Sequence, residues 1–253
     1  MKKLGLIGGI GPESTISYYR EIVFGVQKRL GKKQFPPLTV ESLDVYQVLQ
    51  YCREKDMKGL IGYVSEGIAK LAAAGCDFAA LSGNTPHIVF DELQARSPIP
   101  LVSMPAAACG AAQKAGYHRL GLLGTFVTMR EIFFKEPFIK AGIDIVTPSD
   151  AEMDMIQHKI ADELELGIVK KATQDAFRQL LQRMQAEDRI DAAVLGCTEL
   201  PLAFKGLDTS VPVLDTMAIH IEVLVEQIMM NGTVTRSGTL PVLRPSGRIP
   251  KIL

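Results

Sequence analysis

Three pairs of similar segments occur in the same order along the chain, at nearly constant separations. LGLIGGIGPEST begins at Leu4 and LGLLGTFVTMRE at Leu120, an offset of 116 residues. LSGNTPH begins at Leu81 and LGCTELP at Leu195, an offset of 114, and the pair IPLVSM and VPVLDT is offset by 112. Because three ordered pairs with such similar offsets seldom arise by chance, the chain is expected to contain two halves of the same topology.

Each half reads as a series of βα units. Short leucine-rich or β-branched runs alternate with longer segments of helical period, a pattern typical of a mainly parallel sheet. The expected strands span residues 4–7, 38–43, 78–81, 100–103, 119–123, 143–147, 192–195 and 211–214. Helices are expected after Pro12, over 56–74 with Gly75 as the stop, and over 216–231.

The fold class is therefore α/β, with two pseudo-symmetric three-layer domains whose sheets are mainly parallel. We expect residues 1–99 plus 207–253 to form the first domain, with the last helix returning to it, and residues 100–206 to form the second. Matching strand ends would converge on a cleft between the domains, where α/β proteins usually bind ligands. Groups that face one ligand from both sides suit a reaction that removes and returns a proton on opposite faces of one carbon.

Composition disfavours several classes of partner. The 253 residues include 28 Lys plus Arg and 28 Asp plus Glu, so no field of one sign favours nucleic acid or an anionic membrane. The apolar run at 4–10 is too short for a signal peptide or a membrane span, which predicts a cytoplasmic protein. The four cysteines include no C-x-x-C pair, so neither a metal site nor a disulfide framework is expected. A small molecule is the expected partner.

The central segments of the repeat differ at one position, where the first half has Gly83 and the second has Cys197. A thiol at the start of a helix has a stabilised thiolate, so the pKa of Cys197 is expected to fall from about 8.5 toward neutrality, which would make it a usable base or nucleophile. Cys52, Cys76 and Cys109 lie in or beside helical apolar patterns, as small buried thiols do.

Loops that lead from a strand into a helix offer unpaired backbone N–H groups and the positive end of a helix dipole, both suited to a carboxylate. The candidate binding residues follow four strand ends: Gly9 and Ile10, Asn84 and Thr85, Thr125 and Thr128, and Thr198 and Glu199. GGIGPEST lacks the G-x-G-x-x-G spacing of a dinucleotide loop, so a nicotinamide cofactor is not expected. His87 and His220 follow matched strand ends, where each could orient a carboxylate or poise a proton, or cap its own helix.

Five segments resemble those of the aspartate/glutamate racemase family, as far along the chain as about Asn231: GLIGGIGPESTISYYREI, GNTPH, LLGTFVTM, GCTELPL and VPVLDTMAIH. The resemblance implies two pseudo-symmetric α/β domains, often assembled as a homodimer, with the site between them. It also implies racemisation without a cofactor, in which one cysteine thiolate removes the α-proton and the opposite thiol delivers one. Cys197 matches the second of these cysteines. The α-carboxylate of the substrate would be held by Asn84, Thr85 and Thr198, helped by the first loop and Thr125.

The first family cysteine is replaced by Gly83, which has no side chain to donate or accept a proton. Ser82 should point to the opposite face of its strand and is a poor replacement. We therefore expect an amino-acid racemase, of Asp/Glu type or broader, in which Cys197 is the base and water or Thr85 reprotonates the other face, with weak or one-sided activity. Aspartate-specific members tend to carry a basic residue where this chain has Glu165, which argues against a dicarboxylate substrate.

Two alternatives remain open. Glycine at the first position with cysteine at the second is also similar to arylmalonate decarboxylase, in which a single cysteine protonates the carbanion that loss of CO₂ leaves. The other alternative is a homologue that binds a carboxylate without turnover, with Gly83 either natural or introduced. The tail at 235–253 has little helical period and is expected to form an extended arm or to stay loose.

Overall fold

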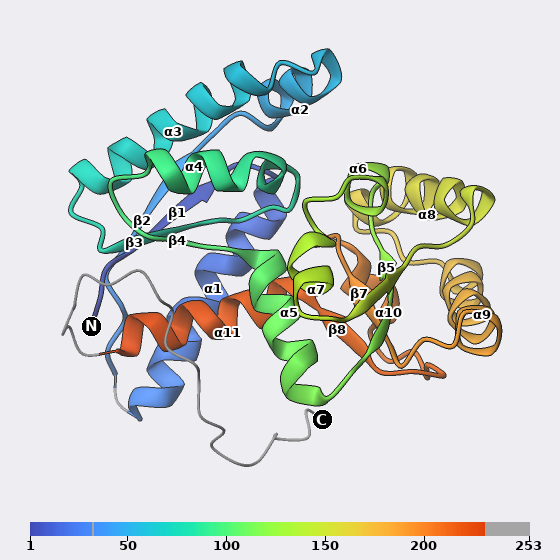
Figure 1. The fold of residues 1–253 in the computed structure, drawn as a ribbon. Coiled ribbons are helices and arrows are strands. Elements are labelled where there is room, and N and C mark those ends of the chain that lie inside the picture. Colours follow the sequence, from blue (N-terminus) through green and yellow to red (C-terminus); the bar gives the residue numbers. More distant parts are fainter. Residues whose placement is uncertain (32, 231–253) are drawn as a thin grey trace.

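Two four-stranded parallel sheets organise the computed structural model, which describes residues 1–31 and 33–230 (Figure 1). The first sheet has the order β2-β1-β3-β4, in which β1 is Leu4–Gly8, β2 Leu38–Ser42, β3 Phe78–Leu81 and β4 Leu101–Val102. The second has the order β6-β5-β7-β8, in which β5 is Arg119–Leu123, β6 Asp144–Val146, β7 Ala192–Leu195 and β8 Val213–Asp215. In register, Leu4 lies opposite Leu38 and Phe78.

The two sheets follow the same path, so the duplication and the α/β fold class predicted from the sequence are confirmed. β1, β3 and β4 occupy the places in the first sheet that β5, β7 and β8 occupy in the second, and these are the pairs that the repeated segments predicted. Each expected strand is present, with ends shifted by no more than two residues.

Helices cover both faces of each sheet, because parallel strands that are apolar on both sides must be buried on both sides. The first sheet packs on one face against α2 (Val45–Glu54), α3 (Met57–Ala73) and α4 (Phe90–Arg96), and on the other against α1 (Pro12–Leu30) and α11 (Thr216–Met229). The second packs on one face against α8 (Asp150–Asp162), α9 (Lys171–Glu187) and α10 (Leu200–Phe204), and on the other against α5 (Met104–Ala115) and α7 (Glu136–Lys140). The remaining elements of the part of the chain that the structure describes are short: η1 (Thr85–Val89), α6 (Phe126–Arg130) and η2 (Leu164–Leu166).

The two domains exchange one helix each. β4 belongs to the first sheet, but α5 directly after it packs Ala108 and Cys109 against the second. β8 belongs to the second sheet, but α11 after it packs Leu224 beside α1 on the first (Figure 1). The chain thus crosses after the fourth strand of each half, not before it. By sheet membership, β4 and β8 therefore lie in the opposite domains from those given by the predicted division at residues 99/100 and 206/207.

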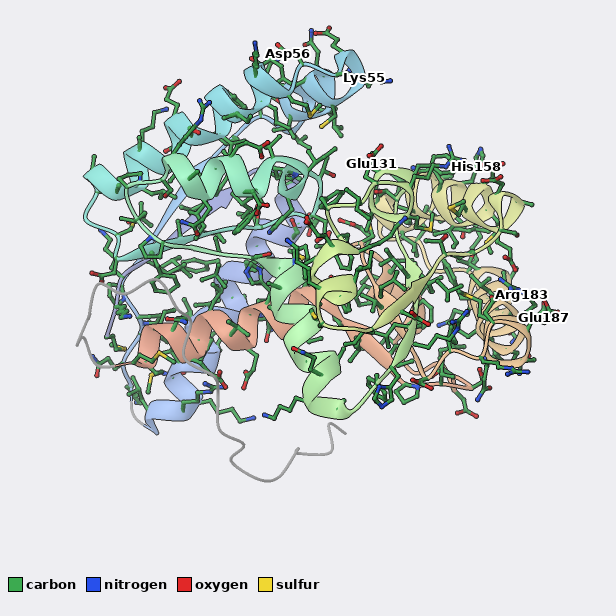
Figure 2. All side chains as sticks on the ribbon, in the orientation of Figure 1. Lys55, Asp56, Glu131, His158, Arg183 and Glu187 are labelled. Atoms are coloured by element: carbon green, nitrogen blue, oxygen red, sulfur yellow. The ribbon has the colours of Figure 1, made fainter. Side chains whose placement is uncertain are left out.

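Local signals explain several helix boundaries. α3 begins after Asp56, whose carboxylate accepts a hydrogen bond from the Gly59 N–H at 2.9 Å, and ends just before Gly75, which has a left-handed φ of 76°. Lys55 and Asp56 make the sharp turn between α2 and α3 at the outer end of both helices (Figure 2). Pro12 opens α1, as its fixed φ favours.

The last helix ends at Met229, and the predicted end at Asn231 and the tail at 235–253 lie outside the described residues. Among residues 1–31 and 33–230, no helix is both long and apolar enough to cross a membrane.

Candidate active site

Cys197 lies two residues after the end of β7, at the carboxyl end of the second sheet, and is 8 % exposed. Its thiol donates a hydrogen bond to Oε2 of Glu199 at 2.9 Å, and the Thr198 hydroxyl donates to the same oxygen at 2.8 Å. The buried thiol therefore faces a carboxylate at the point where α/β proteins place their ligands.

The structure overturns the expectation that the pKa of Cys197 is lowered. Burial raises this pKa well above its ordinary value, and the negative charge of Glu199 and its hydrogen bond to the thiol raise it further. The expected helix begins only at Leu200, spans five residues and has Glu199 at its N-cap, so the acid rather than the thiol stands at the helix start. The surroundings of Cys197 in this structure therefore favour the protonated thiol over the thiolate.

Asn84 links the carboxyl ends of the two sheets. Its Nδ2 donates to the carbonyl oxygen of Gly196 at 2.9 Å, so the residue after Gly83 is bonded to the residue before Cys197. Because Gly196 offers only an acceptor here, the amide orientation is fixed and Oδ1 is left over. Asn84 is 8 % exposed, and among the described residues its Oδ1 has no hydrogen-bond partner. A buried acceptor without a partner is costly, which marks this junction as a place for a donor.

The space beside Gly83 is occupied by the first loop. A Cβ atom added at Gly83 would lie 3.0 Å from the carbonyl oxygen of Ile10 and 3.1 Å from its Cγ2. Gly9 has a φ of 75°, and a Cβ there would collide with the Leu43 carbonyl oxygen, so this loop requires glycine. The N–H of Gly9 is already bonded to Oγ1 of Thr15 at 2.9 Å. In this structure the loop therefore fills the first-thiol position rather than offering the Gly9 amide.

Thr125 and Thr128 support the other side of the site. Thr125 caps α6, and its hydroxyl lies 3.2 Å from that of Thr128. Thr128 is 1 % exposed, and its Cγ2 would lie 2.8 Å from a Cβ added at Gly196. These contacts bring the ends of β5 and β7 together, so Thr128 packs beneath the residue before the thiol.

Both candidate histidines, His87 and His220, are buried, and both ring nitrogens of each are hydrogen-bonded. Nε2 of His87 accepts from the Met104 N–H at 3.1 Å, so Nδ1 carries the proton and donates to the Gly83 carbonyl at 3.0 Å. Burial lowers the pKa of His87 to about 4. His87 thus joins η1 to the start of α5 as a neutral ring, and the half-buried Thr85 begins η1 beside it.

Nε2 of His220 bonds to the Val102 carbonyl at 3.1 Å, and Nδ1 accepts from the Tyr18 hydroxyl at 2.8 Å. Burial lowers the pKa of His220 to about 3. This histidine therefore ties α11 to α1 and β4 in the interior of the first domain. Neither it nor His87 bonds to Cys197 or Glu199.

The structure adds two groups to the site that the sequence did not predict, the Gly196 carbonyl and Thr15. Gly196 matches Ser82 in the repeat, and both donate their N–H to the preceding central strand, to Leu123 and Ile7 respectively. The equivalence of Gly196 and Ser82 could be predicted from the sequence. The bond from Asn84 to Gly196 was not, because it depends on how the two domains meet.

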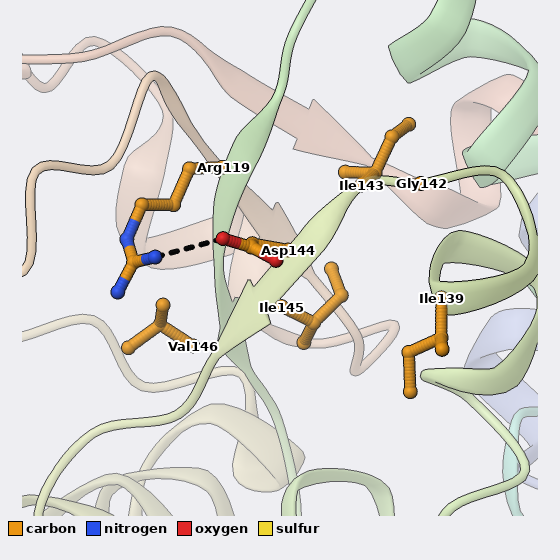
Figure 3. Close-up of a pocket in the computed structure, with 7 residues that line it drawn as sticks. All are labelled: Arg119, Ile139, Gly142, Ile143, Asp144, Ile145 and Val146. Carbon is orange, nitrogen blue, oxygen red and sulfur yellow. Dashed lines mark hydrogen bonds and ion pairs between the residues drawn. The ribbon is translucent and has the colours of Figure 1, made fainter.

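Cys197 lines neither of two further cavities, although His87 lines the second. A groove of about 400 Å³ follows the edge strand β6, where Arg119 and Asp144 pair at 2.9 Å (Figure 3). Both residues begin their strands, so this ion pair lies at the opposite end of the sheet from the thiol. A second cavity of about 320 Å³ lies between α4 and α7, where Glu136 and Lys140 pair at 2.8 Å. Within residues 1–31 and 33–230, no group of three or more His, Cys, Asp or Glu side chains could hold a metal ion.

The fold and the site define a duplicated α/β protein with one buried thiol where the carboxyl ends of its two sheets meet. The model of the Asp/Glu/hydantoin racemase family matches residues 7–224, and the chain belongs to this family. The structure is similar to that of a putative Asp/Glu racemase from Yersinia pestis, with a TM-score of 0.86 and 33 % identity over 91 % of this chain and all of the other. It is also similar to an aspartate racemase homologue from Pyrococcus horikoshii OT3, with a TM-score of 0.81 and 32 % identity over 91 % of this chain and 100 % of that one.

More distant similarities extend the comparison. The broad specificity amino-acid racemase RacX of Bacillus subtilis (strain 168) is 21 % identical over 85 % of this chain and 93 % of its own length. Arylmalonate decarboxylase is similar in fold alone, with a TM-score of 0.53 and 14 % identity over 93 % of this chain and 96 % of that one.

Proposed function

We propose that the protein is a cofactor-independent amino-acid racemase, an isomerase, in which Cys197 exchanges the α-proton from one face of the substrate. The observation that carries the proposal is the single thiol at the end of β7, one residue after the carbonyl that Asn84 joins to the other domain. Membership of the Asp/Glu/hydantoin racemase family supports this reaction class. The relatives named as amino-acid or Asp/Glu racemases support an amino acid as substrate.

The proposed reaction begins with the Cys197 thiolate, which takes the proton from Cα of the bound amino acid. The Cα–H electron pair stays on the carbon and delocalises into the α-carboxylate, which must be stabilised by hydrogen-bond donors in a dry site. Thr85, Thr198 and the neighbouring backbone N–H groups are the proposed donors. Return of a proton from the thiol regenerates the starting enantiomer with exchange, and a proton from water on the other face gives the opposite enantiomer.

The proposed substrate also supplies a positive charge that favours the Cys197 thiolate. Burial and the charge of Glu199 disfavour the thiolate. An α-ammonium group at the free Oδ1 of Asn84 would satisfy that acceptor and place a positive charge near the thiol, which favours the thiolate. Because Cys197 is only 8 % exposed, the surrounding loops must move to admit the amino acid, and their closure would then exclude water.

Gly83 makes the proposed activity unequal for the two enantiomers. It has no side chain, and Ile10 fills the space beside it. The enantiomer whose α-proton faces Cys197 is expected to exchange quickly, and inversion is expected to be slow. The same arrangement favours a second candidate, decarboxylation of a malonate whose carbanion Cys197 would protonate, since that chemistry needs a single thiol.

The assembly and location expected from the sequence, a homodimer in the cytoplasm, are part of the proposal. Sedimentation of the purified chain would test the dimer: a monomer at all concentrations would remove it.

The reaction is tested by α-proton exchange in heavy water, followed by NMR for D and L forms of a set of amino acids. We expect one enantiomer to exchange at least about a hundredfold faster than the other, and Cys197→Ser to abolish exchange, because the base supplies at least that factor. Cys52→Ser makes the same atom replacement in α2 and should exchange at the rate of the unmodified chain. No exchange with any amino acid, together with CO₂ release from malonates, would replace the racemase proposal with the decarboxylase. Neither reaction, with carboxylates still bound, would leave a binding protein.

A further inference from the structure

Ile10 occupies the place where a thiol at position 83 would lie. A Cβ atom added at Gly83 would be 3.0 Å from the carbonyl oxygen of Ile10, 3.1 Å from its Cγ2 and 3.5 Å from its Cβ. These are the nearest atoms outside residues 82–84, and all of them belong to Ile10. Gly83 is buried, whereas Ile10 is half-buried and packs against the core that α3 forms with the first sheet. The space that the missing side chain leaves is therefore filled mainly with hydrocarbon from the first loop.

This filled space belongs to the junction that holds the thiol. Gly83 precedes Asn84, whose Nδ2 donates to the Gly196 carbonyl at 2.9 Å, and Cys197 follows Gly196. The repeat makes Gly83 and Cys197 equivalent positions at the carboxyl ends of β3 and β7. Ile10 thus lies on the first domain's side of the junction, and the thiol lies on the second domain's side.

The Thr15 hydroxyl holds Ile10 in this place. Its Oγ1 accepts from the Gly9 N–H and donates to the Gly11 carbonyl, both at 2.9 Å, so it bonds the residues on either side of Ile10. Because the only hydroxyl proton of Thr15 goes to Gly11, the Ser82 hydroxyl, 3.4 Å away, is the donor in the contact between the two side chains. The first loop is therefore tied to itself and to the residue before Gly83.

The lack of a side chain at Gly83 does not by itself prevent a proton from reaching the second face of the substrate. A gap as large as one water molecule, which takes up about 30 Å³ in the liquid, holds water when polar atoms line it. Such a water would be a proton donor in the place of the missing thiol. Hydrocarbon in the same place leaves no room for water and carries no acidic proton. Access to the second face is therefore limited by Ile10 rather than by the glycine.

We propose that Ile10 determines the stereochemical outcome of the reaction, because it keeps water from the second face of Cα, and that Thr15 is the positioning residue that holds it there. The inference rests on the proposed α-proton exchange at Cys197. Inversion requires that an O–H bond of water breaks as the new Cα–H bond forms, which leaves hydroxide. The proton held by the Cys197 thiol then passes to the hydroxide, and water and the thiolate are regenerated. With water excluded, the proton returns from Cys197 and the configuration is retained.

The first experiment measures exchange and inversion separately in heavy water, for the enantiomer that exchanges faster. NMR follows deuterium at Cα, and chiral chromatography follows the opposite enantiomer. We expect the ratio of inversion to exchange to rise at least about tenfold in Ile10→Ala, because water enters the space that the side chain leaves. Ile16, which is 60 % exposed on α1, provides the matched control Ile16→Ala, which should leave the ratio unchanged. Exchange by Ile10→Ala with the ratio of the unmodified chain would overturn the inference.

The same ratio tests the role of Thr15. Thr15→Val removes the hydroxyl that holds the loop, so the ratio should rise as it does in Ile10→Ala, by a smaller factor. Thr15→Ser keeps the hydroxyl and should restore the ratio of the unmodified chain. A role in stability alone would lower the free energy of unfolding without changing the ratio, and that result would count against Thr15 as a positioning residue.

Alkylation of a thiol introduced by Gly83→Cys separates this inference from the proposed reaction. Mass spectrometry of the labelled peptide gives the rate of iodoacetamide labelling at position 83, and urea unfolding verifies that each variant is folded. We expect labelling to be slow in Gly83→Cys and at least about tenfold faster when Ile10→Ala is added, since the thiol must be accessible to react. This increase supports the closed second face even if no amino acid exchanges its proton. Equal labelling rates in the two variants would remove the inference even if exchange depends on Cys197.

Discussion

The side-chain amide of Asn84 donates to the carbonyl oxygen of Gly196 at 2.9 Å, across 112 positions of the chain. This bond joins the end of β3 to the end of β7 and lies one residue from both Gly83 and Cys197. It therefore couples the packing of the two domains to the position of the thiol.

Replacing Asn84 should weaken the fold and the activity together. Asn84→Ala leaves the buried Gly196 carbonyl without its donor, so the free energy of unfolding should fall by about 1–3 kcal/mol. Asn84→Asp keeps the shape but points a carboxylate at a carbonyl and adds a negative charge near the thiol, so α-proton exchange should fall more than in Asn84→Ala. Urea unfolding and exchange by NMR measure the two effects. Equal stability of both variants and the unmodified chain would show that the bond is not formed in solution.

Substitution at Gly83 should be limited by Ile10. Because a Cβ there lies 3.0 Å from the Ile10 carbonyl oxygen, Gly83→Ala should lower the free energy of unfolding by about 1–2 kcal/mol through overpacking. Gly62 lies in the middle of α3 with no atom within 4 Å of its added Cβ, so Gly62→Ala should be neutral or stabilising. Urea unfolding of the pair tests this contrast, and similar changes for both would contradict it.

Gly83→Cys should also change the α-proton exchange of the slow enantiomer. If the loop at Ile10 yields, the second thiol should allow the slow enantiomer to exchange its α-proton, and the rates for D and L forms should approach each other. If exchange of the slow enantiomer stays unchanged while the variant remains folded, position 83 does not face the substrate.

The repeated segments were sufficient to predict the fold, since matching strand ends such as Leu81 and Leu195 imply a matching order of strands. The crossing points were not predictable in the same way. Whether the chain leaves a sheet before or after its fourth strand depends on where α5 and α11 find an apolar face, and both found it on the other domain. The predicted domain boundaries, placed before β4 and β8, therefore did not include the exchange of α5 and α11.

The site was predictable as a position but not as an electrostatic environment. The strand-end motif located Cys197, whereas its pKa is raised first by burial and further by the Glu199 side chain, which turns back onto the thiol instead of capping α10. The partners of the histidines were not predictable for a similar reason: those of His220, Tyr18 and Val102, come from distant parts of the sequence.

The pH dependence of Cys197 alkylation should change when Glu199 is replaced. Since the Glu199 charge and hydrogen bond both favour the protonated thiol, Glu199→Gln should lower the pKa of Cys197 and raise its rate of alkylation at a fixed neutral pH. The rate of iodoacetamide labelling of Cys197, followed against pH by mass spectrometry, measures this shift. Glu187→Gln serves as the distant control and should leave the profile in place. An alkylation profile that moves to higher pH in Glu199→Gln would mean that Glu199 helps the thiolate.

Tyr18 should stabilise the first domain through His220. Tyr18→Phe removes only the hydroxyl that donates to Nδ1 of His220 and leaves that buried acceptor unpaired, so the free energy of unfolding should fall by about 1–3 kcal/mol. Tyr19, its half-exposed neighbour on α1, provides the matched control Tyr19→Phe, which should change stability little. Chemical denaturation of the two variants measures the difference, and equal losses would contradict this role for the buried hydroxyl.

Acid should destabilise the protein well before its carboxylates titrate. His87 and His220 have folded pKa values of about 4 and about 3, below the ordinary 6.5, so the unfolded chain binds more protons as pH falls from 6.5. Their contribution to stability is therefore complete above pH 6.5 and is lost below it, with a slope that approaches about 2.7 kcal/mol per pH unit for two protons. Urea unfolding between about pH 6.5 and 5 measures this slope, and this window stays above most carboxyl pKa values. His158 lies exposed on α8 (Figure 2), so His158→Gln should leave the slope unchanged. A stability that stays flat across this window would mean that the two buried rings take up protons in the folded protein.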